Sequence, residues 1–338
     1  MIRFATKDDI PAIMEFIDEY WKKGHILATD KEFFNYEMTD PDGVHFVISE
    51  NDDGKINGIE GFIPYGYDAN EKRDVMTVVW KVIQTENKSE KDGSPMLGIN
   101  ILNYIVNNTN SRFVASPGIN TKTIPLYKFL GYHTGTMKHF YRLGNQNELK
   151  LAKANFDDKK TILEKVQYNL VFISTFSELA EKFSFEDYKA LDKKPYKTPE
   201  YIEHRYFKNP IYNYDVFGIK SNEKCGAVIF LRELECKGVK IAHLVDCIGD
   251  WNLLSNIGNS LDGILCERGY EYIDLYEIGL SDEILLRAGF NLKDKEKEII
   301  PNYFEPFEPV NVDIHYFSTD ESVVLFRGDG DQDRPSRR

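Results

Sequence analysis

Three side chains in the first half of the chain could accept a proton. His25 follows Trp21 in a polar loop, where an imidazole could hold or deprotonate an amine. Glu60 lies on a long predicted strand and Asp74 opens the next one, and either carboxylate could act as a base directly or through water. The alternatives are a surface aromatic side chain with a bystander histidine, and carboxylates on a solvated face of a sheet.

One short stretch has the composition of a phosphate-binding helix start. The residues are Gly93-Ser94-Pro95-Met96-Leu97-Gly98, which lead into a predicted helix. The first backbone N–H groups of a helix lack partners within it and favour anions. Pro95 suits the first helical position, and Gly98 would let a phosphate approach the backbone. Gly98 could instead serve the packing of the helix.

The elements that would carry these groups follow a regular order through residue 143. Thr6 is a suitable helix cap, and Asn51-Asp52-Asp53-Gly54 is a hairpin turn. The apolar pattern predicts helices near residues 8–20, 30–38 and 95–107, and strands near residues 2–5, 45–49, 56–67, 74–84 and 112–115. A further helix carries Tyr127 and ends at Gly131, after which residues 133–143 supply the closing strands.

The second half of the chain repeats this order after a lysine-rich connector. Helices are predicted at 200–207 and 252–268, and strands at 214–219, 227–234, 240–247 and 272–275. Leu130-Gly131-Tyr132 and Ala288-Gly289-Phe290 each close a helix and form the clearest internal echo. The sequence therefore predicts an α/β protein of two related domains.

The run that begins at Ser116 and ends at Gly131-Tyr132 resembles a known family. This run follows the strand at 112–115 and contains Asn120 and Tyr127. Together with that strand it resembles the late strand–helix–strand segment of the GCN5-related N-acetyltransferases (the GNAT superfamily). The resemblance implies two tandem GNAT-like domains, each a mixed, mostly antiparallel twisted sheet flanked by helices.

The same resemblance implies a division of the chain into four parts. They are an acyl-CoA-binding domain at 1–143, a connector at 144–167, a degenerate GNAT-like domain at 168–328 and an acidic tail at 329–338. On this division, a fragment that ends near residue 145 should lose acyl transfer but keep some binding of acyl-CoA.

The chemistry implied by the resemblance is N-acyl transfer from acetyl-CoA, or another acyl-CoA, without a metal. Tyr127 would protonate the leaving thiolate, and Asn120 would orient the co-substrate or Tyr127. A backbone N–H in the strand through residues 79–82 would meet the developing oxyanion. The implied co-substrate contacts are Val79, Lys81, Val82, Ser94, Leu97, Gly98, Asn120 and Tyr127.

The resemblance also indicates where an acceptor would bind. The loop after the first helix borders the acceptor site, so Trp21 and His25 would contact the substrate, with His25 or Glu60 as the base. Tyr303 lies in an aromatic stretch at 302–307 that would close over a sugar or plug the domain interface. We therefore expect a small amine as the acceptor, such as an amino sugar or its nucleotide-linked form in surface-polysaccharide synthesis.

The two halves differ at the positions that matter for this chemistry. Asp250 places a carboxylate at the helix start of the second half, where it competes for N–H groups, and Leu285 stands where the first half has Tyr127. We therefore place the chemistry in the first half. Tyr127 could still be a packing residue and Asn120 only a cap. A non-catalytic tandem module, or an aminoacyl or formyl transferase of the same double fold, stays open.

Composition limits the other classes of function. The 338 residues carry a net charge of −13, which argues against nucleic acid or an anionic membrane as the main partner. No apolar run approaches bilayer length, the start lacks a signal-peptide core, and the four cysteines lack CxxC spacing. We expect a cytoplasmic protein with reduced thiols, and a homodimer stays open.

The last ten residues contain three aspartates at alternate positions. Asp329, Asp331 and Asp333 have the spacing of a calcium loop, but the glycine and the bidentate glutamate of that loop are missing. We therefore expect no metal site here and a frayed acidic terminus.

Overall fold

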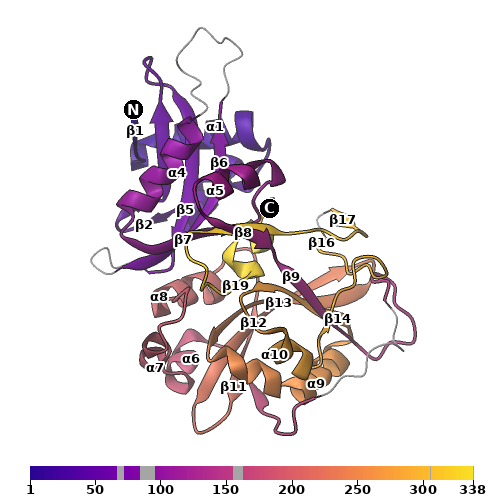
Figure 1. Cartoon of the computed structure of the whole chain (residues 1–338). Coiled ribbons are helices and arrows are strands. Elements are labelled where there is room, and N and C mark those ends of the chain that lie inside the picture. Colours follow the sequence, from indigo (N-terminus) through magenta and orange to yellow (C-terminus); the bar gives the residue numbers. More distant parts are fainter. Residues whose placement is uncertain (67–71, 84–95, 155–162, 305, 338) are drawn as a thin grey trace.

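The computed structural model describes residues 1–66, 72–83, 96–154, 163–304 and 306–337. The chain builds two mixed sheets, one above the other in Figure 1, with β8, β9 and the yellow C-terminal segment between them. No helix of the described part is long and apolar enough to cross a membrane.

The first sheet has seven strands in the order β1-β4-β5-β6-β7-β18-β8. Among its described strands only β6 and β7 run parallel, so the sheet is mixed and mostly antiparallel, as the resemblance implies. The strands are β1 (Ile2–Phe4), β4 (Phe46–Glu50), β5 (Ile56–Pro64), β6 (Arg73–Val82), β7 (Ser111–Pro117), β18 (His315–Ser318) and β8 (His133–Thr136). The helices of this half are α1 (Ile10–Phe16), α2 (Ile26–Thr29), α3 (Lys31–Met38), α4 (Leu97–Asn108) and α5 (Ile124–Phe129).

The second sheet has eight strands and repeats the parallel centre. Its order is β10-β11-β12-β13-β14-β9-β15, with β19 also paired to β14, and β13 and β14 run parallel. The strands are β10 (Asn169–Ile173), β11 (Asp215–Lys220), β12 (Cys225–Cys236), β13 (Val239–Gly249), β14 (Tyr270–Ile278), β9 (Lys138–Leu143), β15 (Asn291–Leu292) and β19 (Leu325–Phe326). The helices are α6 (Phe176–Lys182), α7 (Phe185–Ala190), α8 (Pro199–Ile202), α9 (Gly258–Arg268) and α10 (Asp282–Arg287).

Local sequence explains why these elements begin and end where they do. The Asp30 carboxylate accepts the backbone N–H groups of Glu32 and Phe33 and so starts α3. Gly131 and Gly289 follow α5 and α10 with φ of +80° and +83°, a conformation that favours glycine. The predicted echo between the two helix ends is therefore present in the backbone. Two short hairpins, β2 (Thr39–Asp40) with β3 (Gly43–Val44) and β16 (Tyr303–Phe304) with β17 (Phe307–Glu308), complete the fold.

The two halves exchange strands, which the sequence analysis did not foresee. We expected residues 133–143 to close the first sheet, but only β8 does so, and β9 pairs with β14 and β15 of the second sheet. In return, β18 from the end of the chain lies between β7 and β8 of the first sheet. The boundary between the sheets therefore does not follow a single point in the sequence.

The hydrophobic cores reflect this exchange. One large core joins both halves and contains Phe34 and Phe46 of the first together with Val228 and Phe230 of the second. Separate cores lie beneath α4 and beneath α9 on the other faces of the two sheets. Because one core is shared, burial of apolar surface holds the halves together.

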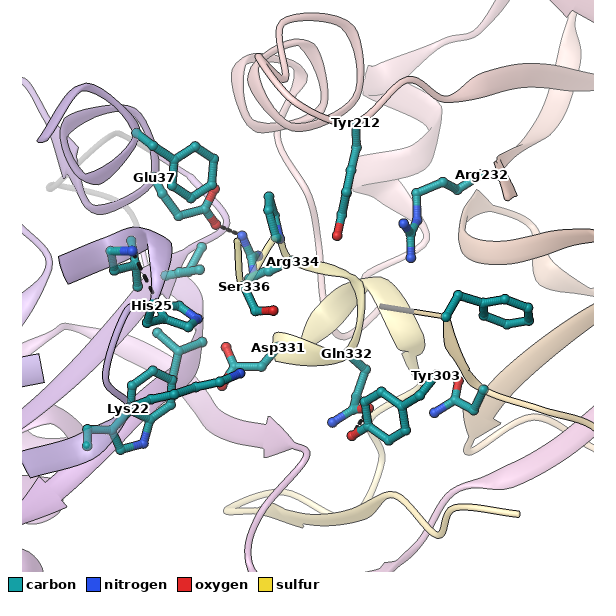
Figure 2. Close-up of a pocket in the computed structure, with 18 of the residues that line it drawn as sticks. Lys22, His25, Glu37, Tyr212, Arg232, Tyr303, Asp331, Gln332, Arg334 and Ser336 are labelled. Atoms are coloured by element: carbon teal, nitrogen blue, oxygen red, sulfur yellow. Dashed lines mark hydrogen bonds and ion pairs between the residues drawn. The ribbon is translucent and has the colours of Figure 1, made fainter. Parts of the chain in front are cut away.

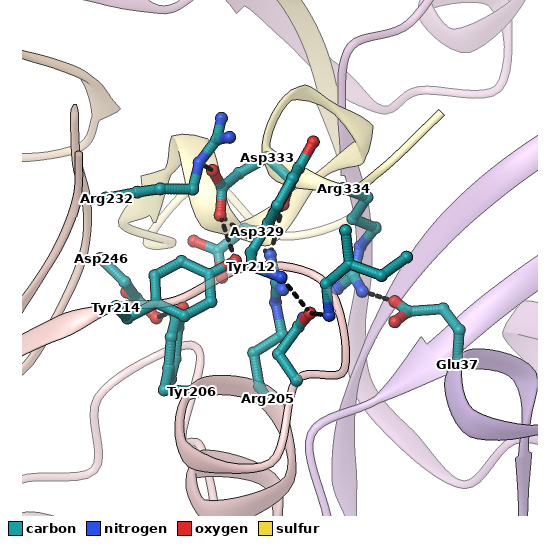
Figure 3. A network of polar contacts seen from close by, with 12 residues as sticks. Glu37, Arg205, Tyr206, Tyr212, Tyr214, Arg232, Asp246, Asp329, Asp333 and Arg334 are labelled. Carbon is teal, nitrogen blue, oxygen red and sulfur yellow. Dashed lines mark hydrogen bonds and ion pairs between the residues drawn. The ribbon is translucent and has the colours of Figure 1, made fainter. Parts of the chain in front are cut away.

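The acidic tail is buried between the halves, so the expectation of a frayed terminus is wrong. Figure 3 shows Asp329 and Asp333 among cationic and phenolic side chains of the second half. Asp333 accepts Arg205 at 3.0 Å and Arg232 at 2.7 Å, and Asp329 lies 2.7 Å from the ammonium of Lys197. Buried carboxylates are stable only when they are paired in this way, so these contacts fix the path of the tail.

This anchoring predicts a large stability effect at Asp333. Asp333→Asn leaves Arg205 and Arg232 buried without a countercharge, and removing one partner of a buried ion pair costs about 3–5 kcal/mol. Urea unfolding should show a midpoint shifted strongly downward. The control is Asp331→Asn, the same change two residues away. Asp331 forms no ion pair among the described contacts, so this variant should unfold near the wild-type midpoint. Equal midpoints for the two variants would contradict the anchoring role.

Candidate functional site

The gap between β6 and β7 is the central feature of the first half. The two strands pair in parallel only as far as Met76 and Ala115. Beyond that point β7 stays paired with β18 on its other edge, and toward β6 the Ser116 hydroxyl donates to the Thr77 carbonyl at 2.8 Å. The strands then diverge around a cavity of about 490 Å³. The two strands of the parallel pair therefore border an opening.

Val79 forms a bulge on the wall of this cavity. Gly61 pairs with Val78 and Glu60 pairs with Trp80, so Val79 has no partner residue on β5. Its φ is +42°, which is strained for a β-branched residue. A bulge leaves backbone groups outside the ladder. The Asp331 carboxylate of the tail lies close enough for the Val79 backbone N–H to lower its pKa, and both residues line the cavity.

Tyr127 lies on α5 and lines the same cavity. Its side chain is 2% exposed, and its ring stacks on Phe317 of β18 with centroids 4.0 Å apart. Burial raises the pKa of the Tyr127 phenol far above its usual value, and the nearby Glu60 carboxyl adds to the rise. The phenol therefore stays protonated at neutral pH and can only give its proton. The residue is both a packed ring and a proton donor that faces the cavity.

Of three other predicted co-substrate contacts, Asn120 and Lys81 line the cavity and Val82 is not among its described wall residues. Asn120 lines the cavity at the start of the turn before α5, and Lys81 lines it from β6. The side-chain Oδ1 of Asn120 accepts the backbone N–H of Lys122 at 2.9 Å, so the residue caps the turn. The side-chain NH₂ group of Asn120 can still face a ligand. Val82 pairs with Gly58 toward the far end of β6.

The predicted phosphate-binding stretch is only partly described. Ser94 lies outside the described residues. Leu97 opens α4 and packs on the core beneath it, and no acidic residue lies in the first turn. At Gly98 a Cβ atom would lie 2.7 Å from the Trp80 ring, so this glycine allows the helix to pack against β6. This close approach to Trp80 is what we expected if Gly98 served the packing of the helix.

The carboxylates predicted as bases are engaged or enclosed. Glu60 is fully buried on β5, where burial raises the pKa of its carboxyl well above the usual value, and it is not among the described residues that line either cavity of the site. Asp74 accepts Arg112 at 2.6 Å and the backbone N–H of Tyr196 at 2.7 Å. Neither residue is among the described residues that line the two cavities of the site.

A second cavity, of about 380 Å³, lies between the two halves. Trp21, His25 and Tyr303, the three residues predicted to contact an acceptor, all line it. Figure 2 shows His25 on one side and Tyr303 on the other, with the tail between them. The two cavities share Trp21, Val78 and Asp331 as wall residues, so they adjoin at this point.

His25 is placed to bind rather than to accept a proton. Its Nδ1 accepts the Leu27 backbone N–H at 3.3 Å and so caps α2. Burial, with the nearby Lys22 charge, lowers the pKa of His25 to about 4. A neutral ring that accepts at Nδ1 carries its proton on Nε2, which is then a donor. The structure therefore favours a binding role over the predicted role as base.

The second half differs from the first at the corresponding positions. Asp250 accepts the Asn252 N–H at 3.1 Å, so the predicted acidic cap is confirmed. Beside the parallel pair β13 and β14, Asp274 is buried with His139, His243 and Arg327. We therefore describe the candidate site in the first half, where the gap cavity lies.

Asp331 is the site residue that the sequence analysis missed. It was noted only for its spacing to Asp329 and Asp333, and the tail was taken as frayed. The spacing could not reveal this, because residues 329, 331 and 333 would share one face of an extended strand, whereas two 3-10 turns at Arg327–Asp329 and Asp331–Asp333 shape the tail in the structure. Among the described residues no cluster of histidine, cysteine, aspartate or glutamate could hold a metal ion.

Comparisons with solved structures agree with this architecture. A GCN5-related N-acetyltransferase from Anabaena variabilis matches with a TM-score of 0.55 and 11% identity over 94% of this chain and 72% of that chain. A conserved protein of unknown function from Enterococcus faecalis, described as a probable N-acyltransferase, matches with a TM-score of 0.53 and 10% identity over 94% and 72%. The chain has the fold of the GCN5-related N-acetyltransferases, so the predicted fold class is confirmed. No protein-family model and no curated protein matches the sequence.

Proposed function

We propose that this protein is an acyl-CoA-dependent N-acyltransferase. The observation that carries the proposal is the open gap between β6 and β7, where the strained Val79 bulge directs a backbone N–H and Tyr127 directs a hydroxyl into one cavity. A backbone N–H can stabilise an oxyanion, and a protonated phenol can give its proton to a leaving thiolate. Both groups would assist acyl transfer from a thioester.

The residues present fit the acyl-CoA co-substrate. The gap is a slot between two strands, with exposed Asn120 at its wall and the unpaired bulge of Val79 within it. The Val79 N–H would bind the thioester carbonyl, and the Tyr127 hydroxyl would lie by the sulfur. The α4 start at Leu97 would receive the phosphates, since no acidic residue competes for its N–H groups.

The second cavity would hold the acceptor amine. We propose an amino sugar because the rings of Trp21, Tyr212 and Tyr303 line this cavity and can stack on the apolar face of a sugar. Arg232 supports the nucleotide-linked form. Its guanidinium lies 4.1 Å from the Tyr212 ring centre and points into the cavity (Figure 2), and a planar guanidinium suits a phosphate.

Two measurements test the proposal. Isothermal titration should show binding of acetyl-CoA, and thiol release should then follow when D-glucosamine, UDP-glucosamine or n-hexylamine is added. A non-catalytic module would release no thiol with any amine. An aminoacyl or formyl transferase would bind acetyl-CoA weakly or not at all, and either result would contradict the proposed function.

A bulky substitution should locate the co-substrate. Thr123 lines the gap cavity at the start of α5, and Thr123→Trp would fill part of that cavity. We expect titration to show at least a tenfold loss of acetyl-CoA affinity. Thr121→Trp, on the exposed side of the same turn, and Asp250→Ala in the second half should bind as the wild type does. Normal binding by Thr123→Trp would place the co-substrate elsewhere.

A further inference from the structure

The three aspartates of the tail do not have the same surroundings. Asp329 lies against Lys197 and accepts the Tyr65 hydroxyl at 2.7 Å, and Asp333 accepts two arginines. Both carboxylates are fully buried. They fix the backbone on either side of Asp331, so the position of Asp331 is held from both directions.

Asp331 faces the opposite way, into the site. It is the one acidic side chain that lines both cavities among the described residues, and Figure 2 shows its carboxylate directed toward the first half. Its side chain is accessible where it borders the two cavities. Its neighbour in the first half is the Val79 N–H, the donor that would bind the acyl carbonyl.

The other candidates for a base do not share this position. His25 uses Nδ1 as a cap, and Glu60 and Asp74 do not line these cavities. Glu37 lines the acceptor cavity but forms an ion pair with Arg334. Asp331 combines access, a position at the junction of the two cavities and the absence of an ion pair among the described contacts.

We propose that Asp331 is the catalytic base that takes a proton from the acceptor amine. The inference rests on the proposed function. The ionised carboxylate accepts one proton from the bound ammonium and passes it to solvent in the acceptor cavity. The freed nitrogen pair forms the C–N bond at the thioester carbon, and the C–S bond breaks with its pair on sulfur. Tyr127 gives its proton to the sulfur and then takes up the second proton that the nitrogen loses. In total, one ammonium and one thioester become an amide, a thiol and one proton in solvent.

The electrostatics agree with this role. Burial raises the pKa of Asp331 to about 6, while the Lys22 charge and the Val79 N–H oppose the rise. The carboxyl is therefore mostly ionised at pH 7 but is a stronger base than an exposed aspartate. The charged and titratable groups that line the two cavities around it are Lys22, His25, Glu37, Lys81, Tyr127, Tyr212, Arg232, Tyr303, Glu308 and Arg334.

Asp331→Asn in the full chain tests the inference. With acetyl-CoA and the amine of the panel above that the wild type acylates best, kcat should fall by about 10²-fold or more, with acetyl-CoA affinity within a few fold of the wild type. In the wild type, kcat/KM should fall as pH drops through about 6, and this limb should vanish in the variant. Formate should partly restore turnover in Asp331→Ala. Asp53→Asn, in an exposed turn, should behave as the wild type.

The outcomes separate this inference from the proposed function. Thiol release by the wild type with unchanged kcat in Asp331→Asn would overturn the inference alone. A faster Asp331→Asn, or one that binds acetyl-CoA more tightly, would also overturn it, because the carboxylate would then be blocking the Val79 N–H. No transfer by the wild type to any amine of the panel would overturn the proposed function and this inference together.

Discussion

Tyr127→Phe should lower kcat by about 10²–10⁴-fold while leaving the fold and the affinity for acetyl-CoA nearly unchanged. The substitution keeps the ring that stacks on Phe317 and removes only the hydroxyl that faces the gap. Because burial holds the pKa of this phenol far above its usual value, the wild-type side chain is protonated throughout the neutral range and serves only as a donor. Steady-state thiol release at saturating acetyl-CoA measures the effect.

The matching control is Tyr132→Phe, a nearby phenol that packs on the same core and is not a described wall residue of the gap. It should keep near wild-type turnover. If Tyr127→Phe turns over as fast as Tyr132→Phe, Tyr127 has only the packing role that the sequence left open.

The elements of the first half could be predicted from the sequence because their signals are local. The Asn51–Gly54 turn, the alternating strands and the glycine after α5 each depend on a few adjacent residues. The positions of Trp21, His25 and Tyr303 around one cavity followed from the fold that the resemblance implied. Local patterns together with one resemblance were sufficient for the outline of the site.

The exchange of β9 and β18 could not be read in the same way. A strand reveals its two faces through its pattern but not the sheet in which it pairs. β8 and β9 are separated by Met137 alone, so nothing in the sequence indicates that the chain passes from one sheet to the other there. The role of the tail was hidden for a related reason, because buried ion pairs join Asp329 and Asp333 to cations more than 100 positions earlier. Composition alone made the segment look like a solvated end.

The strand exchange reverses the expectation for a fragment of residues 1–145. Such a fragment was expected to keep some acyl-CoA binding, but it lacks β18, the only strand through which β8 joins the first sheet. It also lacks Phe317, whose ring covers Tyr127, and it leaves β9 without β14. We now expect the fragment to be unfolded or insoluble, with no cooperative thermal transition in circular dichroism and no heat with acetyl-CoA.

A point substitution in the whole chain makes the same argument without a truncation. Phe317→Ala removes a fully buried ring from β18 and should lower the free energy of unfolding by about 3–5 kcal/mol. Phe129→Ala is the matched control, because that ring, on α5, is 79% exposed and should cost little. The exchange would lose its importance if the 1–145 fragment melted cooperatively and bound acetyl-CoA as tightly as the full chain. In that case β18 would be an addition to a sheet that is already complete, and the first half would be the independent domain that the sequence suggested.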